Sequence, residues 1–401
     1  MITQDRIVSG VRRLLPDFLL PLLAVVDKPR KRFLRQAVAS ILLAGSLCIK
    51  DMARWIRDDC SDVFYRIKRL TRHLASSHGD LAPAVTAYRA ACGRYIQADT
   101  PLLIDLTDVA KPRARKMPYL SLVYDGSEDR LVNGYWCLEV YAQLPRKRIL
   151  PLALDLFSID DPAVGSRNLQ IHRTVRALHQ ALNGKGIWIA DCGFDGLDVY
   201  ETWFSLRAHF VVRQRGDRHV VTDHGIHLTE LHLLEHLRQR QMHQHQQTQL
   251  VWTRVHLPKR NEPLYLVASW KTGCDRPLIV LTTLVIETLP QARQIMGYYR
   301  QRWTCEEAGR FLKNRIGLER FCVRRYEAVQ RLMLLAMFAM GFLTWMLLRS
   351  RRLIRAMLTM TSRFRKPCPF VYYRLLDGFQ QFARQHRKLA SEIPIPAFEN
   401  G

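Results

Sequence analysis

The sequence predicts an α/β protein in which a mixed sheet carries helices on its faces, is interrupted by a β-rich insertion and is flanked by helical regions. Three observations predict this class. Short apolar runs typical of buried strands begin after residue 99 and first follow one another as a meander. Further runs then alternate with segments of helical spacing. Hydrophobic residues make up 48% of the 401-residue chain, which is enough for a sizeable core.

The charge and the cysteines narrow the class of protein. Lys and Arg together number 61 against 36 Asp and Glu, a net charge of +25. Such a surplus favours a polyanionic partner, because each neutralised phosphate releases condensed counterions, although membrane-surface proteins share it. Nine cysteines stand singly between Cys48 and Cys368. This scatter predicts reduced thiols in a cytosolic protein rather than disulfides or a zinc site.

The N-terminal region, residues 1–98, is expected to be helical and to bind DNA. Val11–Val26 has the spacing of an amphipathic or core helix rather than of a signal peptide. Basic clusters at Lys28–Arg32 and Arg66–Arg69 suit contacts with a DNA backbone. A solvated helical face explains the same clusters equally well, so both interpretations stay open.

The central region, residues 99–320, is expected to be the catalytic domain. Buried strands are predicted at Pro101–Asp105, Tyr135–Leu144, Ile149–Phe157, Ile187–Asp191, His209–Arg213 and Leu278–Val285. Helices are predicted at Asn168–Leu182, Leu197–Leu206 and, as one long helix, Leu289–Asn314. Residues 216–274 are rich in His, Gln and Arg and include strand-like runs at Leu250–His256 and Leu264–Trp270, so they are expected to form the β-rich insertion.

The C-terminal region, residues 321–401, is expected to be helical and basic. Leu332–Leu348 is uncharged and flanked by arginines, as a membrane span is. It falls slightly short of the roughly 20 residues that a span needs, and no second such stretch occurs in the sequence. A buried core helix, and no membrane, is therefore the expectation.

Four polar residues share one stripe of the predicted helix Leu289–Asn314. Tyr299, Arg302, Glu306 and Lys313 lie at offsets of 0, 3, 7 and 14 residues. At about 100° per residue they project to roughly 0°, −60°, −20° and −40°. A carboxylate flanked by a hydroxyl and two cations suits a metal-dependent phosphodiester site, in which the acid binds the metal while the cations and the hydroxyl hold phosphates. An exposed polar face with pairing between Arg302 and Glu306 is the ordinary explanation.

The spacing Tyr-x2-Arg-x3-Glu-x6-Lys within YRQRWTCEEAGRFLK resembles the signature of IS4-family bacterial insertion-sequence transposases. The blocks IDLTDVAKP, YLSLVYDGSEDRLVNGYW and IWIADCGFDG are also similar to that family. The resemblance covers roughly residues 100 to 345. It implies a ribonuclease-H-like core of the DDE type. The first catalytic Asp, in the pattern Asp-x-Thr, falls on Asp105 with Thr107, the second falls on Asp191, and the catalytic Glu falls on Glu306.

These three carboxylates, called the acidic triad below, suit two divalent cations about 3.5–4 Å apart. Oxygen ligands with open positions favour Mg²⁺, with Mn²⁺ as a substitute, over zinc. Each ligand has a competitor in the sequence. Asp108 borders the same strand as Asp105, Asp195 follows Asp191 past a glycine turn, and Glu307 neighbours Glu306 but points about 100° away. The motifs favour Asp105, Asp191 and Glu306 over these neighbours.

Further candidates for DNA contact are Thr107, beside Asp105, and residues at the start of the insertion and within it. Arg215 and Arg218 border a basic turn that suits a phosphate, or that is an ordinary solvated turn. Trp252 and Trp270 suit stacking on an unpaired base, but a role in the core is favoured. The histidines of the insertion lack the spacing of a metal site.

The resemblance implies cut-and-paste transposition. The expected reaction is recognition of terminal inverted repeats in double-stranded DNA, divalent-metal cleavage there, and joining of 3′ ends to target DNA. A homodimer on DNA and a cytoplasmic, nucleoid-associated location in a bacterium follow as expectations from the family. A nuclease of the same fold that cuts without strand transfer, and a DNA-binding regulator that has lost catalysis, are the rival functions.

Overall fold

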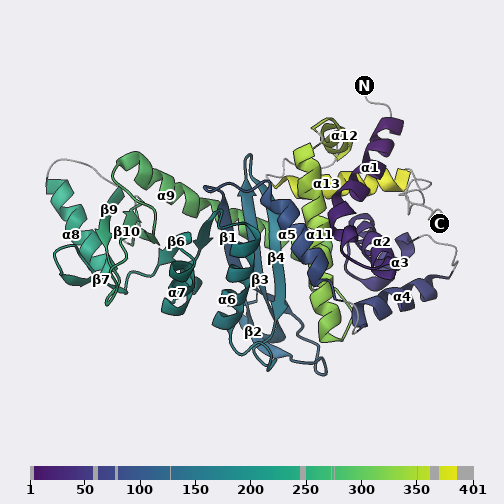
Figure 1. Ribbon diagram of the computed structural model, residues 1–401, viewed down its shortest axis with the longest axis horizontal. Coiled ribbons are helices and arrows are strands. Elements are labelled where there is room, and N and C mark those ends of the chain that lie inside the picture. Colours follow the sequence, from purple (N-terminus) through teal and green to yellow (C-terminus); the bar gives the residue numbers. More distant parts are fainter. Residues whose placement is uncertain are drawn as a thin grey trace.

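The computed structural model of the protein describes residues 4–56, 62–76, 80–126, 128–243, 250–271, 273–274, 276–349, 351–361 and 370–385. A central sheet separates a helical lobe, built from both ends of the chain, from a second lobe of strands and helices (Figure 1). The strands are β1 (Pro101–Ala110), β2 (Ser121–Asp125), β3 (Arg130–Leu144), β4 (Arg148–Phe157), β5 (Ile187–Ala190), β6 (His209–Gln214), β7 (His219–Val221), β8 (His227–Thr229), β9 (Leu250–Val255), β10 (Leu264–Ser269) and β11 (Leu278–Thr282).

The helices fall into three groups along the chain. Those of the N-terminal region are α1 (Gln4–Ala24), α2 (Lys28–Ala44), α3 (Ile49–Trp55), α4 (Val63–Ala75) and α5 (Ala82–Gly93). Those of the central region are α6 (Arg167–Ala181), the short 3₁₀ turn η1 (Cys192–Phe194), α7 (Leu197–Ser205), α8 (Glu230–His243), α9 (Leu289–Gln301), α10 (Trp303–Phe311) and the π-helical turn η2 (Leu312–Ile316). Those of the C-terminal region are α11 (Tyr326–Arg349), α12 (Arg351–Thr361) and α13 (Val371–Gln385).

Within the described residues, nine strands form one mixed sheet. Its order is β2-β3-β1-β5-β6-β11-β10-β9, with β4 also paired to β3. Neighbours β3 and β4 run antiparallel to each other, as do β1 and β3, whereas β1, β5 and β6 run parallel. The α/β class predicted from the sequence, a mixed sheet with flanking helices, is thereby confirmed.

The segment 216–274 extends the central sheet. Its strands β9 and β10 pair with each other, and β10 pairs with β11, which in turn pairs with β6. The strands β7 and β8 form a separate two-stranded sheet, and α8 follows β8 directly. The sequence expectation did not include α8, so this segment holds a helix as well as strands.

Helix α11 is the centre of the helical lobe. It packs along β4, and helices α1, α2 and α4 contact it from the other side (Figure 1). The Thr344 hydroxyl donates to the Ile149 carbonyl of β4 at 2.6 Å. Among the described helices, α11 is the one long and apolar enough by itself to cross a membrane, yet 78% of its most apolar window is buried inside the protein. The predicted core helix is thereby confirmed.

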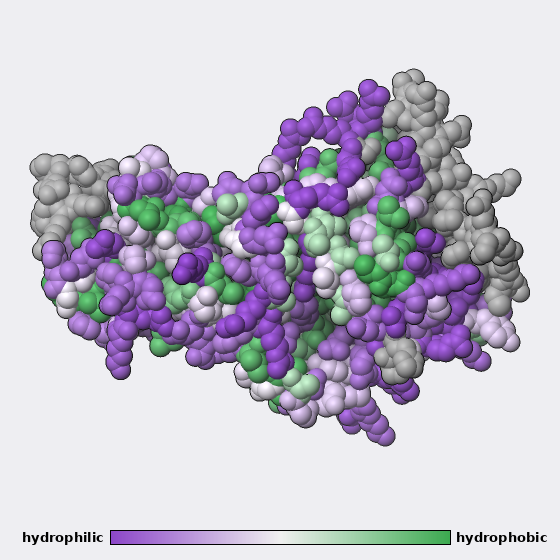
Figure 2. All heavy atoms as spheres, viewed as in Figure 1, coloured by the Kyte–Doolittle hydropathy of each residue, from purple (hydrophilic) through white to green (hydrophobic). Residues whose placement is uncertain are grey.

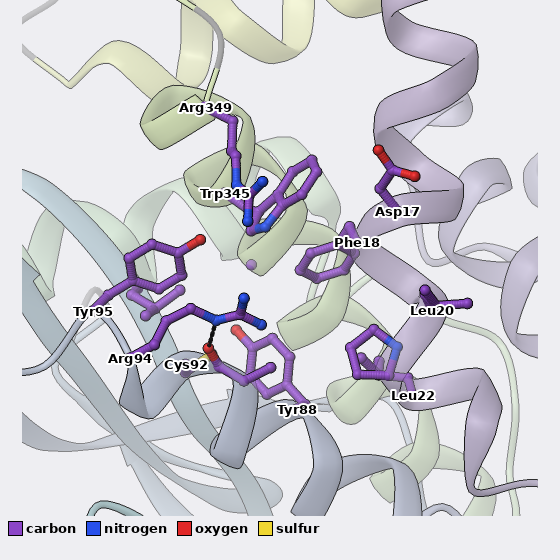
Figure 3. A pocket seen from close by; sticks show the side chains of 14 residues that line it. Asp17, Phe18, Leu20, Leu22, Tyr88, Cys92, Arg94, Tyr95, Trp345 and Arg349 are labelled. Atoms are coloured by element: carbon purple, nitrogen blue, oxygen red, sulfur yellow. Dashed lines mark hydrogen bonds between the residues drawn. The ribbon is translucent and has the colours of Figure 1, made fainter.

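A cavity of about 180 Å³ lies where α1 closes over α5 and α11. The rings of Phe18, Tyr88 and Trp345 face it, with Arg94 and Arg349 nearby (Figure 3). None of its lining residues belongs to β1, β5 or α10. The cavity is therefore a packing feature of the helical lobe, remote from the acidic residues described below.

The predicted single helix Leu289–Asn314 is wrong in one respect, because it is divided at Arg302. The Arg302 amide donates to the Tyr299 carbonyl at 3.0 Å, and the Cys305 amide donates to the Arg302 carbonyl at 2.8 Å. Both bonds span three residues, so the chain tightens between α9 and α10. After Phe311 the π-helical turn η2 widens the helix instead. The uniform 100° spacing of the predicted stripe is therefore lost at both places.

Candidate active site

The unequal lengths of two neighbouring strands bring the first two acids together. β1 pairs with β5 over Pro101–Leu103 but with β3 as far as Ala110, so β1 continues beyond the end of β5. Asp105 lies on this continuation, and Asp191 follows the last residue of β5. Because the two strands are parallel, both carboxylates reach the same edge of the sheet.

Helix α10 supplies the third acid and Arg302 joins it to the first. The Arg302 guanidinium donates to Glu306 Oε1 at 2.6 Å and lies 3.5 Å from Asp105 Oδ2. Its side chain is 14% exposed, against 24% for Asp105 and 29% for Glu306. The ordinary explanation of the stripe, pairing of Arg302 with Glu306, is therefore present, and it is extended to Asp105. A cation thus bridges two members of the triad.

The carboxylates of the triad lie close enough to perturb one another. Burial raises the pKa of Asp105 to about 6, Arg302 opposes this rise, and the charges of Asp191 and Glu306 add to it. Burial lowers the pKa of Arg302, but the surrounding acids Asp105, Asp191 and Glu306, together with Tyr299, raise it above its usual value. The edge of the sheet therefore concentrates negative charge, which the Arg302 guanidinium partly offsets.

A further carboxyl lies beneath this edge, and the sequence analysis missed it. Glu139 stands opposite Asp105 on β3 and is 2% exposed. The Tyr141 hydroxyl donates to Glu139 Oε2 at 2.9 Å. Burial raises the pKa of Glu139 to about 8, and the charge of Asp105 contributes. The sequence held one signal for Glu139, namely an acidic residue within a strand predicted to be buried.

The signature lysine does not contact the triad. Lys313 Nζ donates to Asp108 Oδ1 at 2.9 Å and pairs with Glu319 Oε1 at 3.0 Å. Lys111 reinforces the same junction, because its Nζ donates to the carbonyls of Glu319 and Phe321 at 2.6 and 2.9 Å. Asp108, the alternative to Asp105 as the first ligand, is therefore paired with Lys313. This ion pair and the Lys111 hydrogen bonds connect the end of β1 to the residues between η2 and α11.

The remaining predicted contact residues differ in accessibility. Tyr299 is 9% exposed beside Arg302, and the Thr107 hydroxyl lies 3.5 Å from the Asp108 carbonyl. Arg215 is exposed, whereas Arg218 is 17% exposed and pairs with Asp195. The structure thus gathers Tyr299 and Arg302 near the triad and places Arg218 in an internal ion pair. Their roles toward DNA stay predictions.

The chemistry of the donor set fits a divalent cation. Three carboxylates meet at one sheet edge, and their mutual repulsion is what a bound cation relieves. With Arg302 between Asp105 and Glu306, no group of three acidic, His or Cys side chains among the described residues is arranged to hold a metal ion directly. Movement of Arg302 or of a carboxylate is needed before all three acids share one ligand sphere.

Part of the chain that forms this site matches a known protein family. Residues 151–342 match the family described as "Transposase DDE domain". This part of the chain is therefore similar to a transposase DDE domain. The matched residues include Asp191 and Glu306 and begin after Asp105.

Two further comparisons concern solved structures and curated proteins. The chain is similar to the piggyBac transposase in its synaptic complex with hairpin DNA, with a TM-score of 0.49 and 11% identity over 94% of this chain and 78% of that chain. No curated protein matches the chain. Hydrophilic side chains cover much of the visible face around the DDE domain (Figure 2). A DDE transposase domain implies a nuclease or transposase enzyme.

Proposed function

We propose that the protein is a DNA transposase of the IS4 family that cleaves DNA at element ends and joins the 3′ ends to target DNA. The observation that carries the proposal is the convergence of Asp105, Asp191 and Glu306 at one edge of the sheet in a chain with a transposase DDE domain. The Tyr-x2-Arg-x3-Glu-x6-Lys spacing supports the narrower family. A bacterial source and the use of terminal inverted repeats belong to the same proposal.

Each residue of the site is given a proposed role. Asp105, Asp191 and Glu306 are proposed to hold two Mg²⁺ ions, for which Mn²⁺ can substitute. When bound, such ions activate the attacking oxygen and stabilise the leaving oxygen of an in-line displacement. Arg302 keeps Asp105 and Glu306 apart before the ions enter and is then available to a phosphate oxygen. Tyr299, 9% exposed in the preceding turn, is proposed to help orient the Arg302 guanidinium.

Double-stranded DNA is the proposed partner, bound as transposon ends and as target. The surplus of 61 basic over 36 acidic residues supports a polyanion. Arg215 and Lys313 are proposed phosphate contacts, and Lys313 reaches one by leaving Asp108 or Glu319. Two ends must be paired before joining, so a homodimer on DNA is part of the proposal.

The test is excision of a plasmid-borne element that carries this gene between its native flanks, in Mg²⁺. Wild type is compared with Asp105→Asn, Asp191→Asn and Glu306→Gln, which keep the side-chain shapes and remove the charges. Excision by wild type and a loss of at least about 100-fold in each variant is the expected result. Glu307→Gln, one residue from Glu306 but paired with Arg310, is the matched control and is expected to excise normally.

Other outcomes of the excision assay would favour one of the alternative functions. Binding of the ends without any cleavage by wild type would favour a DNA-binding regulator. Cleavage without joined product would favour a nuclease. Normal excision by one triad variant would remove that residue from the ligand set.

A further inference from the structure

A buried polar cluster joins the start of the segment 216–274 to the turn that carries Asp191. Asp191 is the N-cap of η1, its Oδ1 accepting from the Gly193 amide at 2.8 Å. The same turn ends at Asp195, four residues later, whose side chain is 7% exposed. The position of Asp191 therefore depends on how firmly residue 195 is held.

Arg218 holds Asp195 at two points. Its Nε and Nη2 donate to Asp195 Oδ1 at 3.0 and 2.6 Å, and Nη2 also donates to the Asp195 carbonyl at 2.9 Å. One guanidinium thus fixes both the side chain and the backbone of the residue that closes the turn. A planar fork can do this, whereas a lysine ammonium cannot do so with the same geometry.

The rest of the cluster keeps this contact buried. The Tyr200 hydroxyl donates to Asp195 Oδ1 at 3.0 Å and accepts from Gln214 at 2.7 Å, and the Arg218 guanidinium lies 5.3 Å from the Tyr200 ring centre. Glu230, the first residue of α8, is fully buried, and its amide donates to the Arg218 carbonyl at 2.9 Å.

We infer that Arg218 is a positioning residue for Asp191, through which the segment 216–274 controls metal binding at the triad. The inference rests on the proposed function, since it assumes that Asp191 is a ligand. The sequence predicts a phosphate contact for Arg218, but its side chain donates its hydrogen bonds to Asp195, which favours the positioning role. Second-layer partners that orient a metal ligand typically change metal affinity by about 10–100-fold when they are lost.

The experiment measures Mn²⁺ binding to the full chain without DNA, by the electron paramagnetic resonance signal of free Mn²⁺. Wild type, Asp191→Asn and Arg218→Lys are compared. Arg254→Lys is the matched control, because Arg254 forms an ion pair with Asp223 at 2.9 Å within the same segment, away from the Asp191 turn. We expect Arg218→Lys to bind Mn²⁺ about tenfold more weakly, and Arg254→Lys to bind as wild type does.

The outcomes separate the inference from the function on which it rests. If wild type binds Mn²⁺ in an Asp191-dependent manner and Arg218→Lys binds equally well, the inference alone is overturned. If wild type shows no Asp191-dependent binding, the proposed function and the inference both fail. An equal loss in Arg254→Lys would mark a general effect of the segment and would also overturn the inference.

A second variant covers the case in which Arg218→Lys does not fold. Tyr200→Phe keeps the aromatic ring and removes one hydrogen bond to Asp195. A smaller loss of Mn²⁺ affinity in the same direction is expected, with unchanged affinity as the overturning result. Thermal unfolding of every variant in EDTA shows which proteins are folded before Mn²⁺ is added.

Discussion

At the scale of single residues, the positive charge of Arg302 stabilises the acidic triad and also opposes the binding of a metal ion by it. Arg302 lies between Asp105 and Glu306 and offsets their repulsion in the absence of a cation. The same contacts stand between these two acids and a shared ligand sphere. Arg302 therefore stabilises the protein before metal enters, and this role can be separated by experiment from any role in phosphate binding.

Replacing Arg302 by Gln is expected to destabilise the metal-free protein. The loss should be about 1–3 kcal/mol, below the roughly 3–5 kcal/mol of a fully buried pair, because all three side chains keep some exposure. Urea unfolding in EDTA and then in Mn²⁺ measures it. The rise in stability on adding Mn²⁺ should be larger in the variant than in wild type. An equal rise in both proteins would contradict the inference that Arg302 offsets the same repulsion between Asp105 and Glu306 that a bound cation relieves.

Glu139 should give the protein a measurable pH dependence. Its pKa in the folded state is raised to about 8 from 4.5, by burial first and by Asp105 and Asp108, against Lys313 and the Tyr141 hydroxyl. Between these two values the unfolded chain releases a proton that the folded protein keeps, so stability falls as pH rises through this window. Glu139→Gln removes this contribution.

The prediction is that the stability of Glu139→Gln, relative to wild type, increases from pH 5 to pH 8. Urea unfolding at several pH values in EDTA gives the two curves. Glu230 also has a raised pKa and remains in both proteins, so its contribution cancels; the difference reports Glu139 together with its coupling to Asp105. Parallel curves would show that Glu139 is not held in its neutral form.

At the scale of elements, the approach of α10 to the sheet depends on a glycine. A Cβ atom on Gly309 would lie 3.2 Å from Glu139 Oε2, whereas one on Gly297 of α9 would have no neighbour within 4 Å. Replacing a helical glycine by alanine ordinarily gains about 0.5–1 kcal/mol. The two glycines therefore form a matched pair in consecutive helices.

Gly297→Ala is expected to gain this stability, and Gly309→Ala to gain less or to lose stability. The reason is that the new methyl group crowds the buried carboxyl, which must shift beside Asp105. Thermal unfolding of both variants gives the comparison, and excision activity should fall only in Gly309→Ala. An equal gain at the two positions would mean that α10 can move away from β3 freely.

The sequence predicted most strands because buried strands are apolar without interruption. Predicted and observed starts of β4, β5 and β6 differ by no more than one residue, and Asp191 follows its strand as expected. Helix α8 was not predicted, because its apolar residues are set among many His, Gln and Arg. The division of the predicted helix at Arg302 could not be read from the sequence either. Neither Pro nor Gly stands there, and the hydrogen bonds that tighten the chain involve only backbone atoms.

Side-chain partners were less predictable than the elements that carry them. Asp105, Asp191 and Glu306 could be proposed from motifs at strand ends and on a helix. The pairing of Lys313 with Asp108 and Glu319 depends on how η2 lies beside β1, which helical spacing does not reveal. The basic turn that ends at Arg218 has the composition of a phosphate site, yet the buried Asp195 lies within reach of its guanidinium.

At the scale of the whole molecule, a single sheet connects two lobes of different construction. β4 faces α11 and the helices from both ends of the chain, while β11, β10 and β9 carry the sheet into the second lobe (Figure 1). The triad lies between, where β1 and β5 are neighbours. If DNA bound at the triad extends over both lobes, its phosphates are neutralised at several places along the protein and not at the triad alone.

The salt dependence of DNA binding tests this arrangement. If six to ten phosphates are neutralised, affinity for a duplex should fall by about 10³–10⁵ between 50 and 200 mM salt. Fluorescence anisotropy with a labelled duplex, measured over a series of NaCl concentrations in EDTA, gives the slope of log affinity against log salt. The net charge of +25 leads us to expect a steep slope for element ends and unrelated DNA alike, with tighter binding to the ends. A slope near zero would show that the basic surplus serves some purpose other than contact with phosphates.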